Sequence, residues 1–297
     1  MKTAPVLNSA RVFMLSYRHA YHAGNHADVL KHLVLVSVLR YLQRKEAAIR
    51  YVDTHAGRGQ YLLNDDVARR LSEADAGAAL LWNADSSAGE RPAAIDNYIE
   101  ILRGFNPDGD LKHYPGSPAI AAALLRPQDQ AELFELHPVD SEALADLFKR
   151  QRKQLRVRAG DGLAGLKSVL PPLSRRGLVL IDPSYEVKAE YAQVVNALID
   201  ARRRFANGVY MIWYPLLARP EVARLPGKLT AVAGNSWLDI KFRVRADAAD
   251  GFGMAGSGLF IVNPPYVLKS EMQACLPWLV AHLAQDNGAD YQLDGQG

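Results

Sequence analysis

Short apolar runs alternate with helical segments along most of the chain, and this alternation constrains the fold more than any other feature. Nearly continuous apolar runs are typical of strands that are buried on both faces of a parallel sheet. The alternation therefore predicts an α/β fold with a mostly parallel, doubly covered sheet. Only a loop separates the last two runs, which indicates an antiparallel hairpin at the end of the sheet. The predicted strands are AIRYVD (48–53), AELFEL (131–136), LRVRAG (155–160), GLVLID (177–182), GVYMIWY (208–214), SWLDIKFRV (236–244) and SGLFIVN (257–263).

The segment from about 60 to 110 breaks this pattern, because it reads as two amphipathic helices with no strand between them. We interpret it as a helical insertion within one domain that spans residues 14–297. Residues 1–13 are expected to form a flexible leader, since Met14 is a plausible second start.

Two helix starts can be predicted from capping residues. A helix is expected over residues 26–44 with Asp28 as its N-cap. A second helix is expected to begin with Ser117 as N-cap and Pro118 at its first position, where proline is well tolerated.

The bulk composition argues against membrane and secreted classes. At 297 residues, 49% hydrophobic and 23% charged, the chain fits a soluble globular protein. No apolar run approaches the roughly 18–20 residues of a membrane span, and the N-terminus lacks the apolar stretch of a secretory signal. Cys275 is the only cysteine, so no intramolecular disulfide can form. We therefore expect a protein of the reducing cytoplasm, with no membrane association.

The charge pattern favours a polyanionic partner. The net charge is only +3, but arginine outnumbers lysine 24 to 11. The guanidinium group matches the geometry of phosphate better than an ammonium group does. Arginines clustered on one face would bind a nucleic acid, and the alternative is a surface that is charged only for solubility.

A glycine turn follows the first predicted strand. In DTHAGRG, Asp53 ends the strand, and Gly57 and Gly59 lie in the turn, where glycine lets a ligand approach the backbone. The spacing D-x-x-x-G-x-G is not the G-x-G-x-x-G dinucleotide fingerprint. Alone it is equally compatible with a purely structural turn.

Four consecutive strand ends each carry a carboxylate: Asp53, Glu135, Asp161 and Asp182. Such acids would repel one another at one edge of a sheet, and a cationic ligand would relieve that repulsion. Glu135 is placed to accept hydrogen bonds from two ribose hydroxyls, and Asp161 from an adenine amine. S-adenosylmethionine carries a sulfonium, an amine, a ribose diol and an adenine amine, so it is the expected cofactor.

Two similar tetrads follow apolar runs, DPSY at 182–185 and NPPY at 263–266. An acid or amide, then proline, then an aromatic ring can grip a planar amino-bearing base. DPSY follows the glycine turn and the Glu135 and Asp161 strand ends, so we expect it to be the active copy. NPPY is interpreted as a strand terminator on the final strand, with only one helix after it.

Several segments together resemble one family, in order from Met14 to about Trp278. They are MLSYRHAYHAGNHADVLKH, DTHAGRGQY, YPGSP, ELHP, GDG, SRRGLVLIDPSYE and WYP. The chain resembles the RlmJ family of bacterial 23S rRNA adenine-N6 methyltransferases, which act at adenine 2030. The resemblance implies a Rossmann-like methyltransferase fold with a small helical insertion, and S-adenosylmethionine as methyl donor.

The resemblance also implies roles for single residues. Asp182 would be the catalytic residue, and Tyr17 would contact the substrate RNA. Ser184 departs from the usual D-P-P-Y tetrad of the family. The cofactor contacts that the family pattern carries over are His32, His55, Ser117, Glu135, Asp161 and Gly162.

These residues suggest a mechanism without a metal. The Asp182 carboxylate and the Pro183 carbonyl would accept the two N6 hydrogens of adenine, which stabilises the charge that grows on the nitrogen. Tyr185 would stack on the base. His22 and His26 have the i, i+4 spacing of some zinc sites, but no third ligand stands at a clear spacing, so we expect no metal.

The expected substrate is 23S rRNA, free or early in assembly, with no stable protein partner. A set of arginines is expected to hold the RNA backbone around the pocket. They are Arg18, Arg58, Arg150, Arg152, Arg175 and Arg176.

Three alternatives remain. A DNA adenine-N6 methyltransferase would share the chemistry, although the 60–110 insertion is small for a target-recognition domain. A non-catalytic RNA-binding protein with a relict methyltransferase fold would not need acids at all four strand ends. An NAD-dependent dehydrogenase is disfavoured by the missing third glycine.

Overall fold

The structure, a computed structural model, describes residues 22–63, 73–84, 91–248 and 253–296. The predicted leader, the candidate start Met14 and the predicted RNA contact Tyr17 lie outside these residues. Within the described ranges, no helix combines the length and apolar character that crossing a membrane requires.

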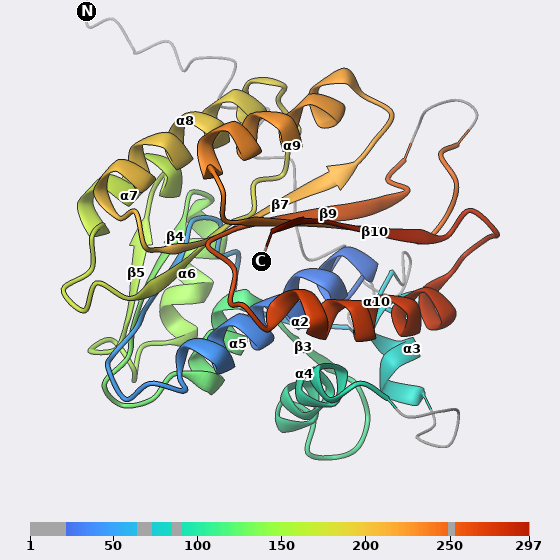
Figure 1. The fold of residues 1–297 in the computed structure, drawn as a ribbon. Helices are drawn as coiled ribbons and strands as arrows, with labels where there is room; N and C mark the ends of the chain where they lie inside the picture. The colour runs from blue at the N-terminus through green and yellow to red at the C-terminus, as the bar shows by residue number, and fades with distance from the viewer. Residues whose placement is uncertain (1–21, 64–72, 85–90, 249–252, 297) are drawn as a thin grey trace, which may run out of the picture.

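An eight-stranded sheet forms the centre of the molecule (Figure 1). Across the sheet the strands are β10 (Asp290–Gln296), β8 (Trp237–Arg243), β9 (Gly256–Val262), β7 (Val209–Leu216), β6 (Gly177–Ile181), β1 (Arg50–Asp53), β4 (Gln130–Glu135) and β5 (Leu155–Ala159). The five strands from β7 to β5 pair in parallel. β9 runs antiparallel to both of its neighbours, β7 and β8. The predicted Rossmann-like α/β fold and its antiparallel hairpin are confirmed.

The prediction that no strand follows NPPY is wrong. β10 pairs antiparallel with β8 and forms one edge of the sheet. Its sequence, DYQLDGQ, contains no apolar run, because an edge strand has a partner on one side only and lies largely exposed. Apolar content is a weak signal for such a strand.

Helices cover both faces of the sheet (Figure 1). On one face, α7 (Gly162–Val169), α8 (Ala189–Arg204) and α9 (Pro220–Ala233) pack over one apolar core. The core of the other face is packed by α2 (His26–Leu42), α4 (Ala93–Gly104), α5 (Ser117–Leu124), α6 (Pro138–Leu147) and α10 (Leu268–Leu283). Every residue of α2 from 26 to 39 is buried. A helix that is apolar almost all round needs partners on all sides, and α2 therefore lies at the centre of this layer.

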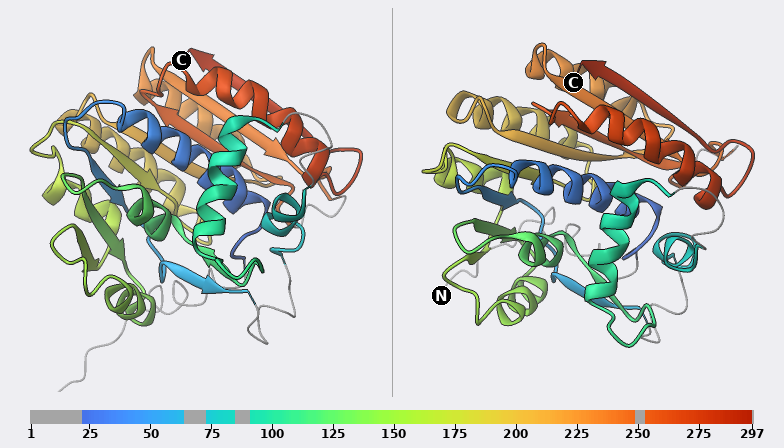
Figure 2. Two further views of the ribbon diagram at one scale, coloured as in Figure 1. Left: turned by 90° about the horizontal axis from the view of Figure 1, so that it is seen from below. Right: turned by 60° about the horizontal axis from the view of Figure 1, so that its bottom comes forward.

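The described part of the segment predicted as an insertion holds α3 (Ala78–Asn83) and α4. Two short strands frame it, β2 (Gln60–Leu62) and β3 (His113–Pro115), which pair antiparallel in a separate sheet. Figure 1 and Figure 2 show this group against the α2 layer, on the side that faces away from the sheet. The two strands were not predicted, since three residues are too few to show a period in the sequence.

Both predicted helix caps are displaced. The N-cap of α2 is Asn25, whose Oδ1 accepts hydrogen bonds from the N–H groups of Ala27 and Asp28, so Asp28 is not the cap. The N-cap of α5 is Gly116, and Ser117 is the first helical residue. In both helices the residue that was predicted as the cap uses its side chain for contacts inside the fold instead.

Candidate active site

The four predicted acids lie together at one edge of the sheet. Asp53 ends β1, Glu135 ends β4, and Asp161 and Asp182 follow the ends of β5 and β6. Because these four strands are adjacent and parallel, their carboxyl ends form one continuous edge, which is called the carboxyl edge below. Ligands of α/β sheets bind at this position.

Asp53 is completely buried and accepts three hydrogen bonds. Its Oδ2 accepts from the hydroxyls of Tyr51 and Ser117, each at 2.7 Å, and its Oδ1 accepts from the His55 N–H at 3.2 Å. Burial raises the pKa of Asp53 to about 6, although the hydroxyl bonds oppose this shift. The carboxylate thus fixes the start of α5 against the end of β1.

The glycine turn after β1 is held by Glu135. Its Oε2 accepts from the Gly57 N–H and its Oε1 from the His137 N–H, both at 2.7 Å. Gly57 has a φ of 60°, and a side chain there would collide with the Tyr61 hydroxyl. Burial raises the pKa of Glu135 above its ordinary value, against the effect of the two N–H groups. A carboxylate has about four acceptor sites, so two remain for a ligand.

Asp161 and Gly162 begin α7 beside this turn. Asp161 is exposed and caps the helix, because its Oδ1 accepts from the Ala164 N–H at 3.1 Å. A side chain on Gly162 would collide with the Thr54 backbone, so glycine lets α7 approach the end of β1. His55 lies next to this contact, and burial lowers its pKa to about 4, which makes it neutral at pH 7.

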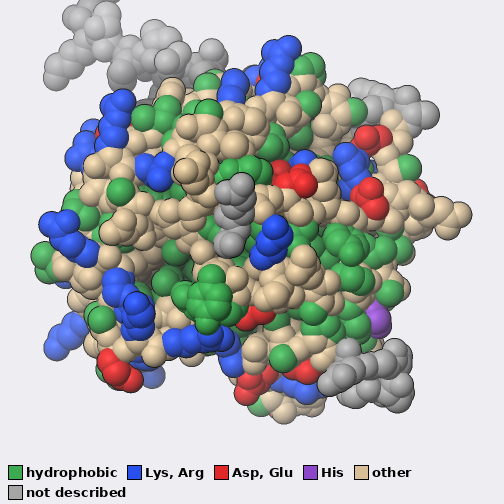
Figure 3. Space-filling model, viewed as in Figure 1, with side chains coloured by type: hydrophobic (Ala, Val, Ile, Leu, Met, Phe, Trp, Pro, Cys, Tyr) green, Lys and Arg blue, Asp and Glu red, His purple; other side chains and the backbone are tan. Residues whose placement is uncertain are grey.

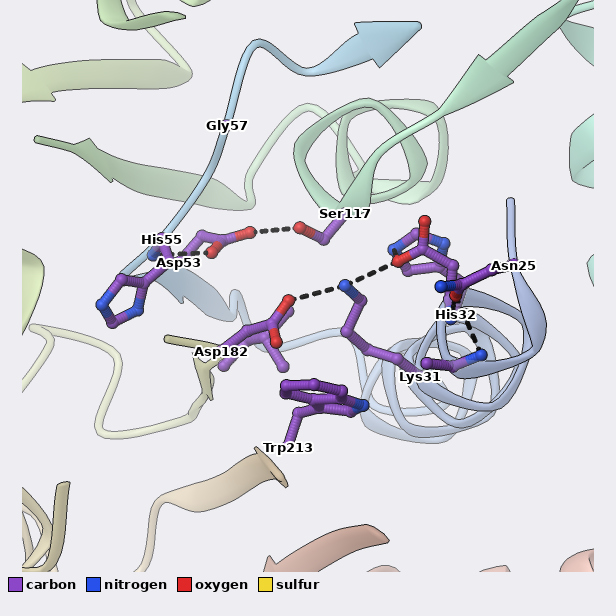
Figure 4. Close-up of polar contacts among 12 residues, drawn as sticks. Asn25, Lys31, His32, Asp53, His55, Gly57, Ser117, Asp182 and Trp213 are labelled. Atoms are coloured by element: carbon purple, nitrogen blue, oxygen red, sulfur yellow. Dashed lines mark hydrogen bonds and ion pairs between the residues drawn. The ribbon is translucent and has the colours of Figure 1, made fainter. Parts of the chain in front are cut away.

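Asp182 forms an ion pair that was not predicted from the sequence. The Nζ of Lys31 lies 2.6 Å from Oδ2 of Asp182 and 2.8 Å from Oδ1 of Asp28 (Figure 4). The Lys31 side chain is only 5% exposed. Burial acts to lower the pKa of Lys31, but the charges of Asp182 and Asp28 outweigh it and raise the pKa above its ordinary value. The i, i+3 spacing of Asp28 and Lys31 is a local signal for their contact with each other, but the sequence holds no local signal for the contact with Asp182.

The rest of the tetrad packs inward. Pro183 is buried, and Tyr185 is 2% exposed with a φ of 54°. The Tyr185 hydroxyl donates to the Trp213 carbonyl at 2.9 Å, and its ring packs on Tyr191. In this arrangement the Tyr185 ring is not open to a base. The ring beside Asp182 and Lys31 is that of Trp213 (Figure 4), a half-buried residue of β7.

In the parts of the chain that the structure describes, no group of three or more His, Cys, Asp or Glu side chains could hold a metal ion. His22 instead contacts Glu73, with 2.9 Å between His22 Nδ1 and Glu73 Oε1.

The profile of the family described as "Ribosomal RNA large subunit methyltransferase D, RlmJ" matches residues 46–294. The chain belongs to the RlmJ family.

Two relatives of known name match over most of their length. The ribosomal RNA large subunit methyltransferase J of Escherichia coli K12 is 44% identical over 270 residues, which cover 91% of this chain and 94% of that protein. The protein of the same name from Haemophilus influenzae is 41% identical over 282 residues, which cover 95% and 98%. A crystal structure of a Legionella pneumophila protein is 34% identical, with a TM-score of 0.83 and coverage of 92% and 98%.

Most of the positions carried over from the RlmJ family lie along the carboxyl edge. His32 is the exception, because it is 1% exposed inside the α2 layer, with its Nδ1 2.8 Å from the Tyr114 hydroxyl. It lies behind Lys31, one residue along α2.

Four of the six arginines expected around the pocket of this RlmJ chain lie at the opposite edge. Arg150 and Arg152 precede β5, and Arg175 and Arg176 precede β6, so all four stand at the amino ends of parallel strands. Arg58 lies in the glycine turn at the carboxyl edge, 3.7 Å from Asp140. Arg18 is outside the described residues.

NPPY also stands at the amino ends of the parallel strands, because β9 runs antiparallel to β7. Asn263 has a φ of 53°, and its Nδ2 donates to the carbonyls of Ala206 and Gly208, both at 2.8 Å. The tetrad therefore fixes the loop before β7, on the far side of the sheet from Asp182. This agrees with its interpretation as a strand terminator.

Proposed function

We propose that this protein transfers a methyl group from S-adenosylmethionine to the N6 amine of one adenine in 23S rRNA, the adenine 2030 on which the family acts. The observation that carries the proposal is the position of Asp182. It opens a DPSY tetrad at the end of β6, beside Asp53, Glu135 and Asp161 on the neighbouring strands, and it is held by Lys31. Membership of the RlmJ family supplies the substrate class.

The hydrogen-bond acceptors along the carboxyl edge fit S-adenosylmethionine. Glu135 keeps acceptor sites for the ribose diol, and the exposed Asp161 keeps one carboxylate oxygen for the adenine amine. Gly57 gives the turn after β1 its left-handed backbone, and Gly162 lets α7 approach the end of β1, so both shape this edge. Asp53, His55, Ser117 and Gly59 complete the proposed wall, with His32 behind it.

When bound, S-adenosylmethionine supplies an electrophilic methyl group. The nitrogen that must attack it is a poor nucleophile, because its lone pair is delocalised into the adenine ring. The Asp182 carboxylate and the Pro183 carbonyl accept hydrogen bonds from the two N6–H groups. These bonds favour a tetrahedral nitrogen and stabilise its growing positive charge. Ser184 leaves the Pro183 carbonyl in place, so the tetrad keeps both acceptors.

In this proposal Lys31 also positions Asp182 for the reaction. Its ammonium group lies 2.6 Å from Oδ2 of Asp182 and holds that oxygen in place by a charge-assisted hydrogen bond. The adenine amine then approaches a carboxylate with one oxygen already bound and one available. Lys31 thus acts through Asp182 and is a positioning residue.

The target base needs an aromatic surface once it leaves its own stack, because base modification requires an unstacked adenine. Trp213 is the ring beside Asp182 in this conformation. Tyr185 takes the stacking role only if its segment moves away from Tyr191. Tyr17 is proposed to contact the RNA at the pocket, as in the family pattern.

The proposed substrate form is 23S rRNA that is free or early in assembly, in the cytoplasm, with no stable protein partner. A buried adenine in a finished subunit would be covered, whereas free RNA can expose it. A DNA adenine-N6 methyltransferase and a non-catalytic RNA-binding protein are the competing functions, and each makes a distinct experimental prediction.

Two measurements test the proposal together. S-adenosylhomocysteine should raise the melting temperature of the protein, whereas NAD should not. Labelled methyl groups should then pass to deproteinised 23S rRNA faster than to assembled large subunits, and not to adenine-containing DNA. Preferred transfer to DNA would support the first competitor, and cofactor binding without transfer to any acceptor would support the second.

A further inference from the structure

The edge of the sheet opposite Asp182 carries a row of exposed cations and one exposed aromatic ring. The loops before β1, β4, β5 and β6 meet there, and the antiparallel β9 delivers Tyr266 to the same edge. We call this the amino-edge surface and define it by Arg44, Lys45, Arg150, Arg152, Arg175 and Tyr266. All six side chains belong to residues that are exposed.

Hydrogen bonds between loops hold this surface rigid. The Arg126 guanidinium donates to the carbonyls of Gln43 at 3.0 Å, Lys45 at 2.8 Å and Ala47 at 3.2 Å. Arg176 donates to the carbonyls of Leu42 and Ala47, and Gln154 donates to the carbonyl of Arg126. Four loops that are far apart in sequence are thus fastened into one platform. A platform of fixed shape loses little conformational freedom when it binds.

The cations of the amino-edge surface form no close ion pair with the described residues. None of its arginines or its lysine lies within 4.0 Å of a described carboxylate, in contrast to Arg126, which pairs with the buried Asp129. Within the loops before β1, β4, β5 and β6, Glu46 is the exposed acid. Figure 3 shows Lys and Arg side chains spread along the side of the molecule where β5 and α7 lie in Figure 1.

The aromatic ring distinguishes the partner that this surface fits. Tyr266 is 72% exposed and packs edge-on against Tyr41, with 5.7 Å between ring centroids. The Arg44 guanidinium lies 5.2 Å from the centroid of the same Tyr41 ring. Cations that track a phosphate backbone beside a ring that can stack on a base are the pattern of single-stranded nucleic-acid binding. The rRNA substrate that the family's name implies supplies such a strand.

The distance between the two edges decides which RNA segment can bind. β6 separates Arg175 from Asp182 and has five residues, which span roughly 16 Å at about 3.3 Å per residue. At about 3.4 Å per stacked nucleotide, the immediate neighbours of an adenine at Asp182 do not reach the opposite edge. A segment farther along the same RNA is the partner that fits this surface.

We propose that the amino-edge surface binds a second segment of the substrate RNA, remote from the target adenine. The arginines hold its backbone and Tyr266 stacks on an unpaired base. This inference rests on the proposed function and adds to it. The enzyme would recognise a larger region of the RNA than the target loop alone.

The test compares a long and a short substrate. Arg150→Gln/Arg152→Gln and, separately, Tyr266→Ala are assayed on full-length 23S rRNA and on a short fragment that carries the target adenine. We expect the KM for full-length RNA to rise about five- to tenfold in each variant, with kcat unchanged and with both constants for the fragment unchanged. The salt dependence for full-length RNA should also weaken in the arginine variant, by roughly 0.7–0.9 in slope per lost phosphate contact.

The matched control is Arg224→Gln/Lys228→Gln, which removes two exposed cations of α9. It should leave the KM for both RNAs unchanged. An unchanged KM for full-length RNA in the amino-edge variants, an equal rise for both RNAs, or the same rise in the control would overturn the inference. The proposed function is judged separately, by whether the wild-type protein methylates either RNA at all.

Discussion

Lys31 and Asp182, which are 151 positions apart in the sequence, form a part-buried ion pair with 2.6 Å between Nζ and Oδ2. Asp28 is the second partner of Lys31 at 2.8 Å, so one cation pairs with two carboxylates. The pair fixes α2 to the end of β6. It thereby couples the helix at the centre of one layer to the DPSY tetrad, which we propose contacts the adenine amine.

Lys31→Met should abolish most methyl transfer at pH 7. The change removes the cation that pairs with both Asp28 and Asp182, so the two carboxylates repel each other and Asp182 loses the contact that holds its Oδ2. A displaced Asp182 cannot accept the hydrogen bond of the adenine amine in the required position, so we expect at least a tenfold fall in kcat throughout the pH range that is measured. The measurement is kcat between pH 6 and 9.

Lys241→Met is the control for this change, because Lys241 also pairs with a buried acid, Asp239 at 3.5 Å, on β8 away from the site. It should keep the wild-type kcat over the same pH range. A Lys31→Met enzyme that binds S-adenosylhomocysteine and turns over normally at pH 7 would show that the ion pair has no role in the reaction.

Glu135→Ala should weaken binding of S-adenosylhomocysteine by about 10- to 150-fold, which corresponds to the 1.5–3 kcal/mol of a hydrogen bond to a charged group. Part of the loss comes from the turn itself, because Glu135 also accepts from the Gly57 and His137 N–H groups. Glu135→Gln keeps one acceptor and should show a smaller loss. Calorimetry gives both dissociation constants, and an unchanged value in the alanine variant would remove Glu135 from the cofactor site.

Asp53 should make the protein less stable as the pH rises from about 4 to about 6. Its pKa is raised from 3.8 to about 6 in the folded state, so in this range the native state binds more protons than the unfolded state. The free energy of unfolding should therefore fall across this window, by on the order of 3 kcal/mol from this group alone. Above pH 6 the contribution is lost and the dependence ends.

Asp53→Asn removes the titrating group and keeps a polar side chain beside Tyr51 and Ser117. Urea unfolding of both proteins at pH 4.5, 5.5 and 6.5 isolates the contribution of Asp53 from that of the other acids. The difference in unfolding free energy between the two proteins should change in favour of the variant as the pH rises. An identical pH dependence of wild type and variant would contradict this assignment.

Gly162→Ala should weaken S-adenosylhomocysteine binding and destabilise the fold by about 1–3 kcal/mol, as overpacking does. The new methyl group would meet the Thr54 backbone, so α7 would have to move away from β1 and take Asp161 with it. Gly104→Ala is the control, since no atom lies within 4 Å of its added carbon. Thermal unfolding should show a loss for Gly162→Ala only; equal stability of both variants would mean that this close approach is not required.

The acids of the site could be predicted from the sequence because each one ends a strand that is recognisable on its own. Asp53, Glu135, Asp161 and Asp182 needed only the rule that parallel strands end at one edge. Lys31 could not be found in this way, because its partner Asp182 is remote in sequence and nothing local reports the contact. The same holds for Trp213, whose place beside Asp182 depends on how β7 packs against β6.

The positions of the arginines follow from the direction of the strands. Arg175 and Arg176 directly precede the strand that ends before Asp182, so they must lie one strand length from it. The expectation that they surround the pocket is wrong, because basic character alone does not show at which end of a strand a residue lies. Edge strand β10 and the short strands β2 and β3 were missed because they lack the apolar period on which strand prediction depends.

The most direct measurement is the identity and position of the methylated nucleoside in 23S rRNA after reaction with S-adenosylmethionine. The wild-type protein and Asn263→Ala should both yield N6-methyladenosine at one adenine, because Asn263 lies at the opposite edge. Asp182→Ala should yield none, while its affinity for S-adenosylhomocysteine stays within a few-fold of wild type. N6-methyladenosine from the Asp182→Ala protein, or its loss in a folded Asn263→Ala protein, would contradict the assignment of the active site.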